Sequence, residues 1–173
     1  MVEFRGAIFE RVRFFFEALQ GARLMSFGSD MGTFLTASDE FSAELIYEGG
    51  ETVALTFDSF KLIYKEGSYC YIRLGLLDNQ GTKNELKLDA GQLVLRAGMT
   101  YPIGPQLLPI QATFSWGDYI NYLPQSYWGN LAVNRFTTDG AETALIEASF
   151  SLGWETDAGS GVEVQCTLLR VST

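Results

Sequence analysis

The C-terminal part of the chain alternates between apolar and other side chains with a period of two. This period is that of a β-strand with one buried face. Small, turn-forming residues at 157–161 divide the stretch into two halves of similar length. The first half carries Ile146, Ala148, Phe150, Leu152 and Trp154 in alternation, and the second Val162, Val164, Cys166 and Leu168. The pattern predicts a long antiparallel hairpin.

Shorter segments of the same kind precede it, separated by residues that suit turns. We predict strands at 41–47, 53–57, 60–65, 69–76, 85–89, 92–96, 110–116, 131–136, 143–154 and 162–171. Thirteen Phe, eight Tyr and 18 Gly beside only four Pro fit short strands and tight turns. The spacing predicts an all-β fold, an antiparallel β-sandwich of jelly-roll-like type or a barrel.

The first hairpin of this series needs a specific register. A two-residue turn on Gly49 and Gly50 would place the apolar sets of its two strands on opposite faces. A shift by one residue restores a common face. We therefore expect a three-residue or bulged turn, with Tyr47 opposite Val53, Leu45 opposite Leu55 and Ala43 opposite Phe57.

Residues 1–22 follow a helical period instead. Gly21 stands where a C-cap glycine would end a helix. We expect an N-terminal amphipathic helix whose apolar stripe is covered by the chain's own sheet or by a neighbouring subunit, followed by a single β domain at 23–173. The stripe comprises Phe4, Ile8, Val12, Phe15, Phe16 and Leu19, and Arg5, Arg11 and Arg13 make the segment slightly basic.

Composition narrows the possible partners. The formal net charge is −9, which disfavours nucleic acid and anionic membrane surfaces. No apolar run has the length of a membrane span, and the N-terminus lacks the layout of a secretory signal. Cys70 and Cys166 both lie in strand-like patterns, where buried free thiols are expected and a disulfide between them is the alternative.

The chain offers few of the residue types that catalysis commonly uses. It contains no histidine, and two separated cysteines cannot form a four-thiolate zinc site. No phosphate-binding glycine motif or calcium loop is present, so we expect no cofactor and no metal. Carboxylates remain a route to glycoside hydrolysis. Their candidates are Glu44, Glu147, Glu155 and Glu163, all at the polar phase of their strands.

Residues 98–130 break the strand rhythm. They hold all four prolines and an aromatic-rich run. Flat apolar rings beside amides and a carboxylate suit a sugar site or a protein interface equally well, and core filling is the third possibility, above all for Trp116. The candidate binding residues are Trp116, Tyr119, Tyr122, Tyr127 and Trp128.

No motif identifies a lineage, so function rests on these surface features. The missing catalytic set and the segregated amphipathic segment favour a non-enzymatic structural or assembly subunit of a multimeric particle, such as a phage or virus structural protein. Its partners would be copies of itself or neighbouring subunits, and a virion would be a compatible location. A carbohydrate-binding β-sandwich module is the alternative, and a carboxylate-only glycoside hydrolase the third hypothesis.

Overall fold

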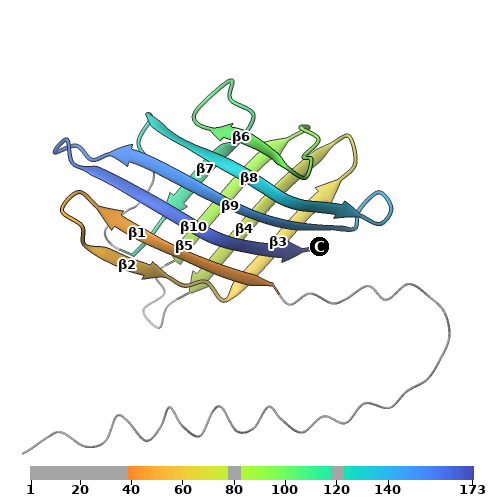
Figure 1. Ribbon diagram of the computed structural model, residues 1–173, viewed down its shortest axis with the longest axis horizontal. Coiled ribbons are helices and arrows are strands. Elements are labelled where there is room, and N and C mark those ends of the chain that lie inside the picture. Colours follow the sequence, from red (N-terminus) through yellow and green to blue (C-terminus); the bar gives the residue numbers. More distant parts are fainter. Residues whose placement is uncertain (1–38, 78–82, 118–122) are drawn as a thin grey trace, which may run out of the picture. The chain divides into compact units, whose positions relative to one another are not determined.

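The computed structural model describes residues 39–77, 83–117 and 123–173. Within these ranges the chain forms ten β-strands and no helix, so no helix there could cross a membrane (Figure 1). The N-terminal helix predicted for residues 1–22 lies outside the described residues. The strands are β1 (Glu40–Tyr47), β2 (Thr52–Leu55), β3 (Ser59–Lys65), β4 (Tyr69–Leu77), β5 (Lys83–Gly91), β6 (Met99–Ile103), β7 (Gln111–Ser115), β8 (Tyr127–Thr138), β9 (Ala144–Glu155) and β10 (Gly161–Ser172).

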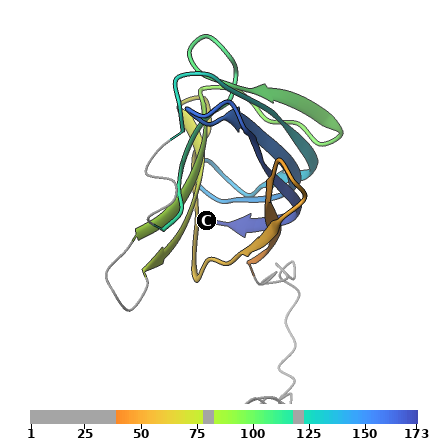
Figure 2. The same ribbon diagram turned by 90° about the vertical axis from the view of Figure 1, so that its left-hand side faces the viewer.

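The strands form two antiparallel sheets that face each other as layers, which confirms the all-β sandwich prediction (Figure 2). The six-stranded sheet has the order β2-β1-β10-β9-β8-β6, and the four-stranded sheet the order β3-β4-β5-β7. Most neighbours are consecutive in sequence, as in a meander. This order differs from the paired Greek keys of a jelly roll, so that part of the prediction is wrong.

The two sheets are joined at one side by backbone hydrogen bonds. Ile103, at the end of β6, forms a parallel bridge with Ile110, just before β7. The Gly104 amide donates to the Ile110 carbonyl at 3.0 Å, and the Ile110 amide donates to the Pro102 carbonyl at 3.3 Å. The fold therefore combines the separate layers of a sandwich with the local sheet-to-sheet continuity of a barrel.

The core fills the space between the sheets with the apolar residues of the alternating pattern. Phe114, Leu45, Leu74, Ile146 and Leu152 are among its fully buried side chains. Aromatic pairs cross from one layer to the other: Phe114 lies 5.8 Å from Trp154, and Tyr64 lies 5.6 Å from Phe136, between ring centroids. Removal of this apolar surface from water is the main stabilising contribution to the fold.

The first hairpin is paired differently from our expectation. Leu45 lies opposite Val53 and Ala43 opposite Leu55, so the predicted register was wrong by two residues. The Tyr47 amide donates to the Glu51 carbonyl at 2.9 Å and closes a three-residue turn at 48–50, which confirms the expected turn length although not the register. Both registers keep the apolar residues on one face, because they differ by an even number of residues. The observed one leaves fewer residues of the turn unpaired.

Three other predictions need correction. Residues 92–96 form no strand, and β6 lies where an irregular segment was expected. Pro102 is compatible with β6 because that strand is at the sheet edge, where a missing amide donor is tolerated. In β10 the register shifts between Cys166 and Leu169, so Leu169 rather than Leu168 points into the core.

Gly129 offers a direct test of how closely β8 and β9 approach. A Cβ atom at this position would overlap the carbonyl oxygen of Ser151, which belongs to the sheet backbone and cannot move aside alone. We expect Gly129→Ala to lower the free energy of unfolding by about 1–3 kcal/mol in a urea titration. Gly75→Ala is the control, since its Cβ would lie 3.9 Å from the nearest atom and should not destabilise. Equal effects of the two substitutions would contradict this packing.

Candidate functional site

The three predicted aromatic residues that the structure describes do not share one surface. Trp116 is partly buried and packs edge-on against Phe57, with ring centroids 5.8 Å apart. The hydroxyl of Tyr127, also partly buried, accepts a hydrogen bond from the Ala112 amide at 3.2 Å. Of the three, only Trp128 is exposed, at 54% of its surface. Tyr119 and Tyr122 lie outside the described residues, as do Phe4, Ile8, Val12, Phe15, Arg11 and Arg13 of the predicted helix.

Trp128 lies against the outer face of the six-stranded sheet because the next strand carries a glycine opposite it. Gly153 is paired with Trp128, and a Cβ there would come within 3.0 Å of the indole Nε1. The neighbouring row across the same face is polar, with Asn130 opposite Ser151 and Ser151 opposite Gln165. An exposed indole therefore borders a row of hydrogen-bonding side chains.

The exposed apolar side chains lie on the edge strand β6, on the segments next to it in the chain and on its neighbour β8; β6 stands with its following loop at the top of Figure 1. They do not all project from one face, since Met99 is paired with the buried Val133 and Trp128 lies on the outer face. Val94 precedes β6, and its carbonyl accepts a hydrogen bond from Tyr101 of that strand at 3.4 Å. The loop after β6 contributes two leucines, and Trp128 comes from the adjacent β8. We call this set the β6 patch; it comprises Val94, Met99, Leu107, Leu108 and Trp128, five of the six large hydrophobic residues exposed in the described part of the chain.

Leu107 is the least protected member of the patch. It is fully exposed and its φ is 66°, in the left-handed region that bulky residues rarely adopt. Gln106 before it also has a positive φ, of 29°. Such a conformation costs on the order of 1–3 kcal/mol and recurs at functional sites. The β6–β7 loop thus presents an apolar side chain to solvent in a strained conformation.

The carboxylate candidates for hydrolysis lie on one open face and not across a groove. All four candidates point outward from the six-stranded sheet, at the alternate positions to its buried residues: Glu44, Glu147, Glu155 and Glu163.

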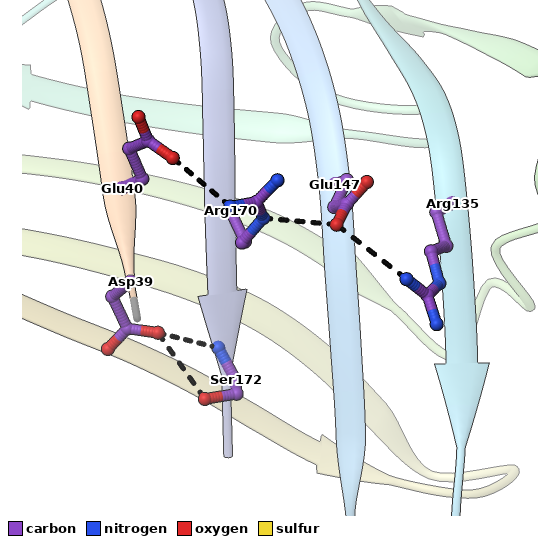
Figure 3. A network of polar contacts seen from close by, with 6 residues as sticks. All are labelled: Asp39, Glu40, Arg135, Glu147, Arg170 and Ser172. Atoms are coloured by element: carbon purple, nitrogen blue, oxygen red, sulfur yellow. Dashed lines mark hydrogen bonds and ion pairs between the residues drawn. The ribbon is translucent and has the colours of Figure 1, made fainter. Parts of the chain in front are cut away.

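Glu147 is moreover held by neighbouring cations (Figure 3). Its Oε1 accepts a hydrogen bond from Arg170 Nε at 3.0 Å and lies 3.9 Å from an Arg135 guanidinium nitrogen. Arg170 in turn reaches Glu40 at 3.1 Å. This row connects four adjacent strands, β8, β9, β10 and β1, and gives Glu147 a structural role.

The two cysteines are free and buried, which confirms the thiol interpretation over the disulfide. Burial raises the pKa of the Cys70 thiol to about 11, with a further contribution from the charge of Asp89. Burial raises the pKa of Cys166 to about 12, although backbone hydrogen bonds partly oppose the shift. The gap beside Cys70, lined by Ile72, Leu88 and Leu95, is too small for a water-sized sphere. Neither thiol is placed to react with a ligand.

Metal binding has no geometric basis in residues 39–77, 83–117 and 123–173, where no group of three or more Cys, Asp or Glu side chains could hold an ion. Comparisons with protein-family models, with curated proteins and with solved structures found no match. Function is therefore inferred from the surface of the protein.

Sequence reasoning found only Trp128 of the β6 patch. The signal for two further members was present: Leu107 and Leu108 form an apolar pair between Pro105 and Pro109. Apolar residues that no strand period places inside are candidates for exposure. Val94 and Met99 were missed because 92–96 was interpreted as a strand and 98–130 as irregular.

The thiols give a test of the closed interior. Because the thiolate is the reactive species, both cysteines should react slowly with Ellman's reagent at about pH 8 in the folded protein. Both should react at once after unfolding in guanidinium chloride. Cys70→Ala and Cys166→Ala assign each thiol. Rapid labelling of either cysteine in the folded chain would show that the interior opens more readily than its packing indicates.

Proposed function

We propose that the protein is a non-enzymatic assembly subunit that associates with copies of itself or with neighbouring subunits through the β6 patch. The observation that carries this proposal is the concentration of exposed large hydrophobic residues around one edge strand. Apolar patches on soluble domains are typical of protein interfaces, where Trp and Met are enriched. A particle of the kind that phage and virus structural proteins form is the context we favour.

The backbone of β6 indicates how such an interface forms. Edge strands can recruit another strand through their unpaired amides and carbonyls. β6 carries Pro102, which has no amide donor, and the Pro102 carbonyl already accepts a bond from Ile110. Association therefore uses side chains and not the addition of a strand.

Leu107→Asp tests the proposal. The wild-type chain should form oligomers that mass photometry and light scattering detect, and the variant should associate at least about tenfold more weakly, as expected for a central interface residue. The folded monomer should keep its stability within about 0.5 kcal/mol, because Leu107 makes no buried contact that the change removes.

Two further variants separate the role of the Leu107 side chain from the effect of an added charge. Ala141→Asp adds the same charge in the exposed β8–β9 turn and should leave association unchanged. Leu107→Gly removes the side chain while glycine accepts the left-handed conformation, so it should weaken association and keep or raise the unfolding midpoint. A wild-type chain that stays monomeric at every concentration would refute the proposal, as would oligomers that neither Leu107 variant affects.

A second candidate function is carbohydrate binding, favoured by the exposed Trp128 indole beside the polar row of Asn130, Ser151 and Gln165. An aromatic face with adjacent hydrogen-bonding groups is the mixture a sugar site requires.

Calorimetric titration with a panel of oligosaccharides separates the two functions. Trp128→Ala should abolish glycan binding if this second function holds, whereas Leu107→Asp should leave it intact, because Leu107 belongs to the loop and not to the sheet face. No heat of binding for any glycan would remove the second candidate and leave the assembly proposal untouched.

A further inference from the structure

The outer face of the four-stranded sheet collects positive charge in an acidic protein. Its pairing places Lys61 opposite Arg73, and Arg73 opposite Lys87, in one row across β3, β4 and β5. Like charges directly opposite one another destabilise a sheet. Arg73 and Lys87 are offset by Glu85 at 2.7 Å and Asp89 at 3.0 Å. Lys61 and Lys65 form no ion pair with any residue in the described part of the chain.

Aromatic side chains accompany these cations. Tyr69 is 42% exposed, and its ring centroid lies 6.4 Å from that of Tyr71. The Lys87 ammonium lies 4.7 Å from the centre of the Tyr71 ring. Tyrosine and arginine are both enriched at protein interfaces. We call this surface, formed by Lys61, Lys65, Arg73, Lys87, Tyr69 and Tyr71, the basic face; Glu85 and Asp89 lie on the same face, so four cations there stand beside two carboxylates.

Negative charge is concentrated at one end of the other sheet. The β1–β2 and β9–β10 turns lie side by side there and are joined by two hydrogen bonds. The Glu48 carboxylate accepts one from the Gly161 amide at 3.0 Å, and the Glu48 amide donates the other to the Gly161 carbonyl at 2.9 Å. Among the described residues no cation forms an ion pair with the carboxylates of these turns. The acidic end comprises Glu48, Glu51, Glu155, Asp157 and Glu163.

We infer that the basic face of one copy docks against the acidic end of a second copy. The inference rests on the proposed assembly function and adds a second contact to the β6 patch. The basic face looks outward from the four-stranded sheet while the acidic end belongs to the six-stranded sheet, so a single chain cannot bring them together (Figure 2). Opposite potentials on one molecule steer copies of it into a head-to-tail contact.

A second copy fits the charges better than an anionic polymer does. The whole chain carries a net charge of −9, which repels nucleic acid and other polyanions beyond the immediate reach of the basic face. A second copy carries the same net charge but spreads it over a folded surface, so the local attraction between its acidic end and the basic face meets less long-range repulsion than a polyanion would. Because the contact joins two different surfaces, it propagates into a ring or a filament and does not stop at a symmetric dimer.

Matched charge reversals test the inference. Lys61→Glu and Glu51→Lys should each weaken association at least tenfold in low salt, measured by light scattering and mass photometry. An equimolar mixture of the two variants should recover it, because each reversed surface then meets an opposite one. Glu142→Lys makes the same charge change as Glu51→Lys at an exposed position outside both surfaces and outside the β6 patch, and it should leave association unchanged.

The folded state of Lys61→Glu can be checked separately. The new carboxylate would stand opposite Arg73, so the variant should keep or raise its unfolding midpoint while association falls. Raising the ionic strength to about 1 M, where the Debye length is about 3 Å, should weaken wild-type association in the same way.

The outcomes separate this inference from the assembly proposal. Oligomers that respond to Leu107→Asp but not to either charge reversal would overturn the docking contact and leave the β6 patch in place. A wild-type chain that never associates would overturn both. Binding of a heparin oligosaccharide or single-stranded DNA that Lys61→Glu abolishes, with association unchanged, would overturn the second copy as occupant of the basic face.

Discussion

The burial of two apolar sheet faces against each other is the constraint on which the rest of this structure depends. Each strand must direct alternate residues inward, so the positions left for function are the outward ones and the loops. Aromatic pairs such as Phe114 and Trp154 bridge the layers, and the gap beside Cys70 admits no water. With the interior so filled, recognition at the described residues takes place on the outside.

The outward-facing side chains of the two sheets differ in how their charges are arranged. On the six-stranded sheet, Glu147 and Glu40 alternate with Arg135 and Arg170 in a charge-balanced row that connects β1 with β8, β9 and β10. On the four-stranded sheet, Lys61 stands in a row of like charges that does not stabilise the monomer. The position of Lys61 among like charges and the strained, exposed conformation of Leu107 are both locally unfavourable. Both residues lie on surfaces where an interaction with a partner would compensate for this cost.

Much of the fold could be predicted because period-two alternation depends only on which face of a strand is buried. The long hairpin of β9 and β10 and the inward position of Trp116 follow from it. Our predictions were wrong where two different arrangements fit the same alternating pattern. The β1–β2 register differs from our prediction by two residues, a shift that leaves every side chain on the same face of the sheet. The bulge in β10 places Leu169 in the core, where Leu168 was predicted.

The sequence by itself determined the class of fold and the absence of histidine chemistry, because these depend on residue type and local period. Tertiary structure alone decided which residues share a surface. Trp116, Tyr127 and Trp128 are close in sequence yet point to different environments, whereas Lys61, Arg73 and Lys87 come from three strands and meet in one row. Strand pairing brings together residues far apart in the chain, and no local pattern specifies that pairing.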